Sequence, residues 1–347
     1  MTRRLLILFS AALASLILVA AGSSPAAAIQ FRALLADTSS RDTDPAPSPD
    51  GKWLAFQSNR GGGSQIWIMP ANGGKPRQLT KEPATVKGPD GKMIPTRVMT
   101  PTWAPDSKSL LFVSTRAGGY NIYSIPLEGG TPKALSAAAG AQRYPSYSPD
   151  GTKIVFPSSR NQPSSLYGFQ LYLMDAKGEV NGPPARQFTR SSGSPGHPIW
   201  SPDGKWICYV AKDFDSTRTV DIGGGMQAKQ SAIFSAFRVF KKPVAGGNEI
   251  RLTGNRTDPG QAEDTWPSWS RDGKWIAFGR NIKGKQNLWV IDVLTSQAFP
   301  VTELGNALKP EWSPDGKSLY FTRINGQDED IWVATGLNLV SNARARK

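Results

Sequence analysis

Cysteine and histidine, two residue types that commonly build chemical sites, are almost missing from this sequence of 347 residues, which contains one of each. With a single cysteine no internal disulfide can form, and Cys208 lies in the apolar stretch 206–210, which favours a small buried side chain. His197 alone cannot supply the several imidazoles of a typical transition-metal site. A Ser-His-Asp triad would need this one histidine beside an activated serine, and no nucleophile elbow is present. We therefore expect no metal, no cofactor and no catalytic residues.

Long apolar runs are also scarce, since only residues 5–21 form one. Arg3 and Arg4 precede this run, and Ala26, Ala27 and Ala28 follow it. A charged start, a short apolar core and a small-residue end are typical of a secretory signal peptide. The sequence thus predicts a signal peptide over residues 1–28 and a periplasmic or secreted protein with no stable membrane span after cleavage. An uncleaved membrane anchor is the alternative.

Acidic residues are outnumbered, with 27 Asp and Glu against 41 Lys and Arg, which gives a formal net charge of +14. In a cytoplasmic protein such a balance would suggest nucleic acid, but an exported protein meets acidic envelope material instead. We expect an envelope protein or an anionic glycan as the partner, and no nucleic acid. A generally basic, soluble surface without a specific partner is the alternative. The basic residues are spread along the chain, apart from a C-terminal tail over residues 338–347.

What the chain does contain is a short repeated phrase, Ser-Pro-Asp-Gly-Lys or a close variant. It occurs six times, about 43 to 69 residues apart, with its acidic residue at Asp50, Asp106, Asp150, Asp203, Asp272 and Asp315. Asp hydrogen-bonds the amides ahead of it and Gly adopts positive φ, so each copy predicts a tight turn. A repeat of this length with variable insertions is typical of stacked β units.

Residues 264–302 illustrate one unit. A short extended stretch precedes the turn, residues 274–278 form a strand, residues 280–286 form a polar loop, and residues 287–292 and 298–302 form two more strands. Four strands in such a repeat make one propeller blade. The sequence therefore predicts an all-β fold, a six-bladed β-propeller of four-stranded antiparallel blades over residues 29–337. A lone blade cannot bury both faces, so the tryptophans are expected to be core residues between blades: Trp53, Trp103, Trp206, Trp269, Trp275 and Trp312.

The sixth unit has only three clear strands, so its ring must be closed by another segment. Residues 31–35 are similar to the fourth strands of other units and lead into Asp44 and Pro45 as a fourth strand should. We expect this N-terminal segment to complete the last blade and protect the sheet edges of a monomer. Residues 338–340 are the alternative closing strand.

The repeats resemble the WD40-like (PD40) repeats of the periplasmic TolB family. Their signature, Pro-x-Trp-Ser-Pro-Asp-Gly-Lys followed by a strand and Ser-x-Arg, matches residues 198–205 and 310–317, with the second element at residues 58–60, 114–116 and 158–160. The resemblance covers residues 30–335 and implies a TolB-like propeller without the α/β domain that precedes it in TolB. The family's role of binding proteins in the cell envelope can be carried over to this chain only in part, because propellers host many activities.

The units differ from one another mainly in one set of loops. The connections from the first to the second strands and from the third to the fourth are short, apart from a longer one at residues 177–184. The other connections carry the long insertions, at residues 81–97, 161–169, 213–235 and 254–264. These connections lie on one face of a propeller, and loops that carry function gather in this way. Tolerated surface insertions are the alternative reading.

The residue before the first-strand Pro also varies between units: Asp44, Thr100, Tyr144, His197, Trp266 and Lys309. Each is expected to ring the central opening on the long-loop face, with Arg143 and Glu311 beside the ring. A purely structural position in a repeat keeps one residue type, so six chemistries suggest a ring adapted to an asymmetric ligand or partner. Six unrelated rim residues are the alternative.

We therefore expect a non-enzymatic exported binding module that presents its long-loop face to an envelope protein or anionic ligand. The alternatives are a propeller enzyme acting on a carbohydrate or lactone with acidic residues at the central opening, and a structural envelope module. Asp213, Asp215 and Asp221 lack the spacing of an EF-hand calcium loop, and the glycines at 223–225 lack the context of a phosphate loop.

Overall fold

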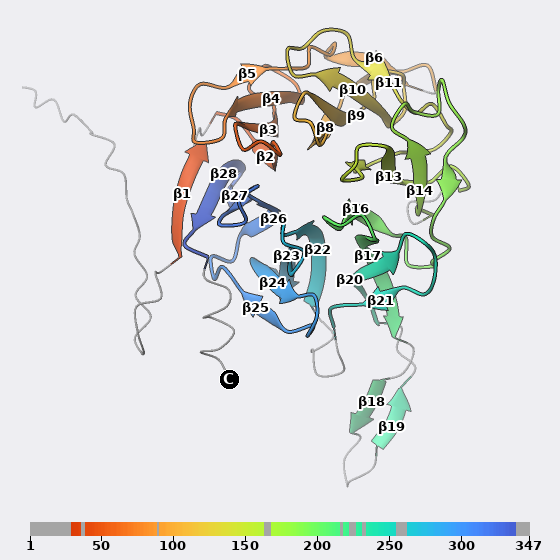
Figure 1. Cartoon of the computed structure of the whole chain (residues 1–347), viewed down its shortest axis with the longest axis vertical. Helices are drawn as coiled ribbons and strands as arrows, with labels where there is room; N and C mark the ends of the chain where they lie inside the picture. Colours follow the sequence, from red (N-terminus) through yellow and green to blue (C-terminus); the bar gives the residue numbers. More distant parts are fainter. Residues whose placement is uncertain are drawn as a thin grey trace, which may run out of the picture.

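Six four-stranded antiparallel sheets stand around a central axis in the computed structural model, which confirms the six-bladed β-propeller (Figure 1). The structure describes residues 29–35, 39–88, 90–162, 168–215, 218–221, 227–230, 234–254 and 262–337. The predicted signal peptide, residues 1–28, and the basic tail, residues 338–347, lie outside these residues. No helix in the described ranges has the length and hydropathy needed to cross a membrane.

The first three blades follow the chain from the inner strand to the outer one. Blade one holds β2 (Asp42–Pro47), β3 (Trp53–Ser58), β4 (Gln65–Pro70) and β5 (Arg77–Gln78). Blade two holds β8 (Val98–Trp103), β9 (Ser109–Ser114), β10 (Asn121–Pro126) and β11 (Lys133–Ala134). Blade three holds β12 (Ser146–Tyr147), β13 (Lys153–Ser158), β14 (Gln170–Asp175) and β15 (Arg186–Gln187).

The last three blades repeat this order, with the chain's first strand in the last one. Blade four holds β16 (Gly196–Trp200), β17 (Trp206–Asp215), β20 (Phe234–Pro243) and β21 (Ile250–Arg251). Blade five holds β22 (Ala262–Trp269), β23 (Trp275–Ile282), β24 (Lys285–Asp292) and β25 (Ala298–Pro300). Blade six holds β26 (Ala307–Trp312), β27 (Leu319–Asn325), β28 (Asp328–Thr335) and β1 (Gln30–Leu35).

The N-terminal strand closes the ring, as the sequence predicts. β1 pairs antiparallel with β28, with Phe31 opposite Ala334. The Phe31 ring also meets the Phe321 ring edge-on, with centroids 6.3 Å apart. Blade six is therefore assembled from both ends of the described chain, which leaves no blade with an incomplete sheet. The alternative strand, residues 338–340, lies outside the described residues.

Each Ser-Pro-Asp-Gly turn is held by its own side chains. In blade one the Ser48 hydroxyl donates to Asp50 Oδ1 over 2.5 Å and accepts from the Trp53 amide at 2.9 Å, while the Lys52 amide donates to the same carboxylate oxygen at 3.1 Å. The glycine that follows Asp50 has φ of 74°. Ser, Asp and Gly are thus each required by the turn, which explains why the phrase recurs.

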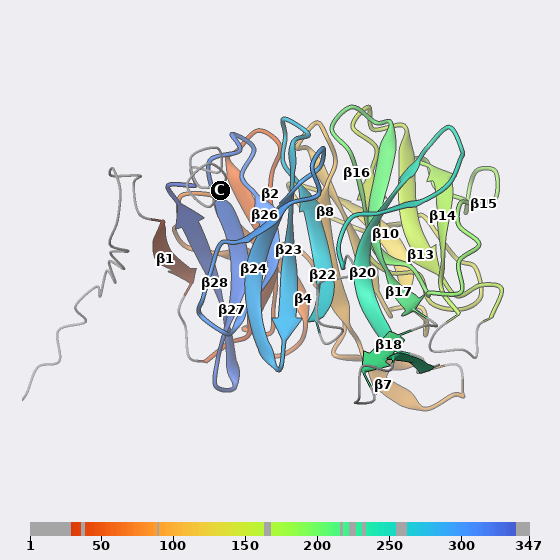
Figure 2. The same cartoon turned by 90° about the horizontal axis from the view of Figure 1, so that it is seen from below.

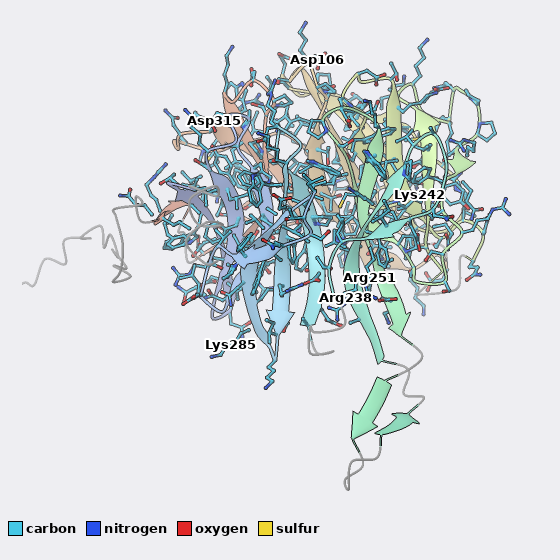
Figure 3. All side chains as sticks on the ribbon, turned by 60° about the horizontal axis from the view of Figure 1, so that its bottom comes forward. Asp106, Arg238, Lys242, Arg251, Lys285 and Asp315 are labelled. Atoms are coloured by element: carbon cyan, nitrogen blue, oxygen red, sulfur yellow. The ribbon has the colours of Figure 1, made fainter. Side chains whose placement is uncertain are left out.

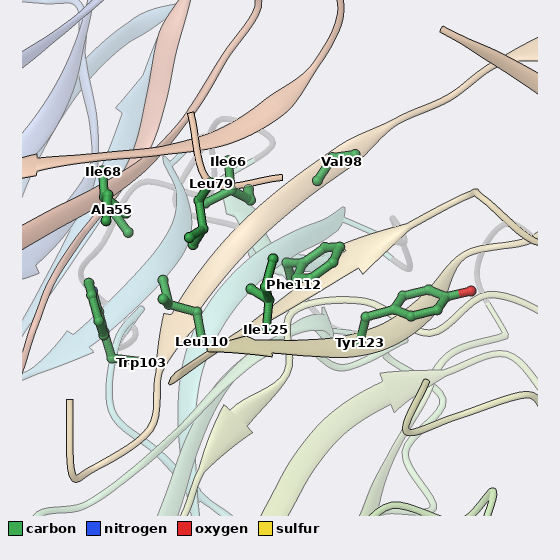
Figure 4. Packing of buried hydrophobic residues seen from close by; sticks show 10 residues of the cluster. All are labelled: Ala55, Ile66, Ile68, Leu79, Val98, Trp103, Leu110, Phe112, Tyr123 and Ile125. Atoms are coloured by element: carbon green, nitrogen blue, oxygen red, sulfur yellow. The ribbon is translucent and has the colours of Figure 1, made fainter. Parts of the chain in front are cut away.

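The hydrophobic core lies between neighbouring blades, in one cluster for each of the six interfaces. Figure 4 shows the cluster between blades one and two, where Ile66 and Ile68 pack near Leu110 and Phe112. The predicted core role of the tryptophans is confirmed for Trp103, Trp275 and Trp312, which are buried, whereas the other three are partly buried. Cys208 is fully buried in strand β17.

Two inserted hairpins protrude from the same face of the disc (Figure 2). One is β6 (Thr85–Lys87) with β7 (Met93–Pro95), and the other is β18 (Arg218–Asp221) with β19 (Gln227–Gln230). Figure 3 shows Asp106 and Asp315, from two of the turns, at the opposite side. We call these sides the long-loop face and the turn face. The insertions at 161–169 and 254–264 are described only in part.

The loop expected over residues 280–286 is wrong, because strands β23 and β24 continue through it to a tight turn at Lys283 and Gly284. Arg280 made this stretch look exposed in the sequence. In the structure its guanidinium is buried and pairs with the fully buried Asp264 carboxylate at 2.7 and 3.0 Å. A charged residue can occupy a strand interior when a partner satisfies it.

Candidate functional site

Six residues with an unusual backbone conformation, one from each blade, surround the propeller axis. We call them the axial ring: Asp44, Thr100, Tyr144, His197, Trp266 and Lys309, with φ of 54°, 55°, 43°, 49°, 49° and 54°. Non-glycine residues rarely adopt positive φ, and doing so costs energy. Every one precedes a proline, which itself disfavours the helical region.

The unusual conformation coincides with a break in strand pairing. The register shifts between Thr43 and Ala46 in blade one and between Leu308 and Glu311 in blade six, with matching shifts in blades two, four and five. Such bulges redirect a side chain out of the regular sheet. All six ring residues, including Tyr144 of blade three, lie in the lining of one cavity.

This axial cavity has a volume of about 280 Å³ and lies between the ring and the turns. In every blade the lining begins at the ring residue and continues toward the turn, reaching Pro49 in blade one. The ring was predicted to open on the long-loop face, and the described cavity instead lies on the turn side. The bulge is the physical reason, because it reorients the residue that sequence spacing alone would place by strand position.

Three aromatic ring residues pack together on the axis. The Tyr144 and His197 ring centroids are 3.8 Å apart, and the Trp266 ring meets His197 edge-on at 5.8 Å. Burial, followed by the nearby charges of Lys309 and Arg143, lowers the pKa of His197 to about 3. Neither imidazole nitrogen has a hydrogen-bond partner in the described structure. His197 is therefore a neutral packing residue here, as its aromatic neighbours require.

Lys309 and Asp44 form an ion pair across the junction of blades six and one. Lys309 Nζ lies 2.7 Å from Asp44 Oδ1 and donates to Thr43 Oγ1 at 2.8 Å. Burial lowers the pKa of Lys309, but the Asp44 carboxylate outweighs it and the net shift is upward. The ammonium also lies 5.8 Å from the centre of the Trp266 ring. The Lys309 ammonium is therefore already paired with groups of the protein itself.

Glu311, two residues beyond Lys309, contributes a second carboxyl group to the cavity. Its Oε2 accepts a hydrogen bond from the Ser268 hydroxyl at 2.8 Å. Burial raises the pKa of Glu311 to about 7, with the Asp44 charge adding to the rise and Ser268 opposing it. A carboxyl group with this pKa changes its charge near neutral pH.

Arg143 is the one predicted site residue that does not line the cavity. Its guanidinium carbon lies 4.7 Å from the centre of the Tyr120 ring and 5.4 Å from that of Phe169. The side chain therefore stacks on aromatic residues of blades two and three. The structure brings the other seven predicted residues together around the cavity.

The layer two residues beyond the ring was not singled out in the sequence, apart from Glu311. Ala46, Thr102, Ser146, Ile199 and Ser268 occupy it in the other blades. The signal that could have found it is the repeat itself, because the same offset from each turn Asp selects these positions. These positions matter because the cavity lies on the turn side of the ring. Only the structure shows on which side the cavity lies.

No group of three or more His, Cys, Asp or Glu side chains suited to a metal ion occurs within the described residues. The side chains of Asp215 and Asp221 and the glycines at 223–225 lie outside what the structure describes. The carboxyl groups of the axial cavity, Asp44 and Glu311, are its only acidic lining residues.

Comparison with sequence families finds repeats of one kind. A PD40 family model, described as the TolB beta propeller domain, matches residues 92–217. An uncharacterised protein of Agrobacterium fabrum, Atu1656, is 29% identical over 69% of this chain and 70% of its own length. An uncharacterised peptidase of Bacillus subtilis, YuxL, is 33% identical over 49% of this chain, but the match spans only 22% of the peptidase.

Solved structures with the same fold are more distant in sequence. A structure described as TolB from Agrobacterium tumefaciens superimposes with a TM-score of 0.61, at 19% identity, over 88% of this chain and 97% of that one. An oligogalacturonate lyase in complex with manganese superimposes with a TM-score of 0.56, at 14% identity, over 90% of this chain and 95% of that one. These two likenesses establish the fold alone, because both identities are low.

Proposed function

We propose that this chain, a TolB-like six-bladed β-propeller, is an exported, non-catalytic binding module of the cell envelope. Its binding site is the axial cavity, which receives a protruding segment of an envelope protein partner from the turn face. The signal-peptide pattern of residues 1–28 supports export to the periplasm or the medium. The net charge of +14 favours encounter with an acidic partner surface.

One observation carries the proposal, namely the convergence of six strained residues on one cavity. Each blade places a non-glycine residue with positive φ at the axis, and the six side chains differ in chemistry. Backbone strain of this kind persists where the surrounding structure enforces it, and it clusters at functional sites. A purely structural ring in a repeat would use Gly or Asn at such a φ.

The size of the cavity indicates what can enter it. Its volume of about 280 Å³ lies at the lower limit of small-molecule pockets, which begin near 300 Å³. A side chain or chain end fits such a space, whereas a folded domain or a long glycan does not. The partner is therefore expected to insert a short segment, with the basic surface making the surrounding contacts.

Filling the cavity tests this assignment. Ser146 lines it, so the Ser146→Tyr variant should occupy the space that the partner segment needs. Ser124→Tyr, on an outer strand of blade two, is the matched control that adds the same side chain elsewhere. The purified proteins are immobilised, exposed to detergent extracts of the native envelope with a chemical cross-linker, and the captured proteins are quantified by mass spectrometry.

We expect wild type and Ser124→Tyr to retain the same partner, and Ser146→Tyr to lose it by at least about tenfold. A third protein lacking the β18–β19 hairpin should retain it. If the partner stays with Ser146→Tyr and is lost with the hairpin, binding occurs on the long-loop face instead. Retention by all of these proteins contradicts both sites.

A second candidate function, an enzyme acting on a carbohydrate or lactone, is favoured by one observation. Glu311 and Asp44 both line the cavity, and the pKa of Glu311, raised to about 7 by burial, suits a general acid or base. Turnover of acidic oligosaccharides or lactones that disappears in Glu311→Gln would support this function. Binding without turnover supports the module.

A further inference from the structure

Glu311 is the only charged residue in the cavity layer that lies two residues beyond the ring. The equivalent positions in the other blades are the small or uncharged residues Ala46, Thr102, Ser146, Ile199 and Ser268. Five of six repeats thus place no charge here, and the fold does not require one. Packing does not explain why the sixth blade has a carboxyl group at this position.

The charges already present do not neutralise Glu311. The described structure gives Glu311 a hydrogen bond from the Ser268 hydroxyl and no ion pair. Lys309, the nearest residue of opposite charge in sequence, pairs with Asp44 at 2.7 Å and binds Thr43. His197 is uncharged near neutral pH, since its pKa is lowered to about 3 by burial. A buried carboxylate without a cation is unfavourable, so the cavity favours a positive ligand group.

Aromatic residues line the same space. Tyr144 and Trp266 belong to the ring, and Trp103 and Trp312 lie closer to the turns. Cations are attracted to the faces of such rings within about 6 Å of the centroid. One such contact is already present at the ring, since Lys309 Nζ lies 5.8 Å from the Trp266 centroid. A carboxylate among aromatic rings is a combination that selects organic cations over anions.

We propose that the axial cavity binds a ligand bearing an ammonium or guanidinium group, with Glu311 as its counter-ion and the aromatic residues as its walls. This inference rests on the proposed function and names the chemistry of the inserted segment, a lysine or arginine side chain or an N-terminal amine. The basic protein surface then contacts acidic parts of the same partner, and the cavity selects the one basic group.

The affinity should depend on pH because Glu311 must be ionised to pair with the cation. The charged and titratable groups around it are Asp44 on β2, Lys309 on β26, Tyr144 beside β12 and His197 on β16. The pKa of Lys309 and that of Tyr144 are raised, and His197 is neutral, so these three keep their charge state between pH 6 and 8. With a pKa raised to about 7, Glu311 is more ionised at pH 8 than at pH 6.

Three small probes of the same shape test the inference: butylammonium, butan-1-ol and butyrate. Their dissociation constants for the purified full chain are measured at pH 6 and pH 8 by NMR titration of the probe signals. At pH 8 we expect butylammonium to bind at least about tenfold more tightly than the alcohol, with butyrate weakest. Its affinity should fall severalfold, by at least about twofold, at pH 6, because the ammonium stays charged while Glu311 becomes protonated.

Two variants show which carboxyl group is responsible. Glu311→Gln keeps the shape of the side chain, and should reduce butylammonium binding to the level of the alcohol and abolish the pH dependence. Glu128→Gln is the matched control, since Glu128 is exposed in the β10–β11 turn, outside the cavity lining, and should change neither. A third variant, Ser146→Tyr, leaves Glu311 in place and should block all three probes.

The results separate this inference from the proposed function. If butyrate binds as tightly as butylammonium, or if Glu311→Gln keeps the preference, the cationic ligand is excluded. If Ser146→Tyr loses the envelope partner while Glu311→Gln retains it, the cavity binds the partner without using this charge. If Glu311→Gln loses the probes but every variant retains the partner, the cation site stands and the proposed partner site fails.

Discussion

The turns and the axial ring are both sixfold features of the same blades, yet one is nearly uniform in sequence and the other is entirely varied. In the turns the side chains themselves hold the backbone, as the Ser48, Asp50 and Trp53 bonds show. In the ring the backbone conformation is the same in all six blades, with φ between 43° and 55°, while the side chains differ. The sequence of the turns is therefore dictated by folding, whereas we propose that the sequence of the ring is set by what binds at the axis.

The largest expected loss of stability comes from breaking an ion pair of the ring, and an ion pair of the turns provides the comparison. Lys309→Met leaves the Asp44 carboxylate without its cation, and both side chains are mostly buried, at 19% and 16% exposure. We expect a loss of about 3 kcal/mol in the free energy of unfolding, measured by urea denaturation. Lys52→Met removes the 3.9 Å turn pair, where the exposures are 76% and 35%, and should cost less than about 0.5 kcal/mol.

The pH dependence of the ring pair has a defined sign. The folded-state pKa of Lys309 is raised above its usual 10.5, so its contribution is complete below that value and is lost as pH rises through the folded pKa. The difference in unfolding free energy between wild type and Lys309→Met should narrow in this alkaline range. Equal losses from Lys309→Met and Lys52→Met would remove the distinction between the two regions.

Exchanging residue types at positive φ is the next test. Gly204 has φ of 69° in its turn, so Gly204→Thr should destabilise the protein by about 1–2 kcal/mol. Thr100 has φ of 55° in the ring and its hydroxyl has no hydrogen-bond partner among the described residues. Thr100→Asn should stabilise the fold by about 0.5 kcal/mol, because Asn tolerates this conformation. Thermal unfolding that shows losses at both positions would mean that the ring residue is set by folding too.

A turn serine provides a smaller effect. Ser201→Ala removes the hydroxyl that donates to Asp203 and accepts from the Trp206 amide at 2.9 Å, and should cost about 1 kcal/mol. The Ser201 hydrogen bond lowers the pKa of Asp203, so this stabilisation is present above pH 3.8 and is lost as pH falls through the lower folded pKa. Urea denaturation between pH 2 and 6 should show the variant's deficit shrinking at the acid end. A deficit that stays constant with pH would contradict the role of the carboxylate.

The smallest expected effect concerns Arg271, which replaces the turn proline in blade five. Its Nη1 donates a hydrogen bond of 3.4 Å to the Pro49 carbonyl oxygen of blade one. The side chain therefore spans the turn face from blade five to blade one. Pro49 also lines the axial cavity. Arg271→Pro should strengthen butylammonium binding about twofold by removing a like charge near the mouth. A decrease would mean that Arg271 takes part in binding.

Much of the fold was predictable because each repeat contains the residues that its turn and its strands require. The turn residues and the strand pattern were sufficient to predict six blades, and residues 31–35 were sufficient to predict closure by β1. The extent of β23 and β24 was not predictable, because the burial of Arg280 depends on Asp264 from the neighbouring strand. Local pattern contains no information about such a partner.

The candidate site was predictable as a set of positions but not as a geometry. Seven of the eight predicted residues line one cavity, since a repeat offset identifies equivalent places in every blade. The side on which they open depends on the bulge and its positive φ, which residues such as Thr100 and Trp266 do not favour. The lack of a cation beside Glu311 could not be predicted, because only the structure shows that Lys309 pairs with Asp44.

Site-specific cross-linking from the mouth of the cavity is the sharpest test of where the partner binds. The native Cys208 is buried and its pKa is raised by burial, so a cysteine added at the surface is the reactive one. A photo-cross-linker is attached through Arg271→Cys, exposed on the turn face beside the cavity-lining Pro49, or through Lys285→Cys, at the end of the β23–β24 hairpin (Figure 3). We expect the envelope partner to be cross-linked from position 271 and not from position 285. Cross-linking from position 285 alone would contradict this expectation.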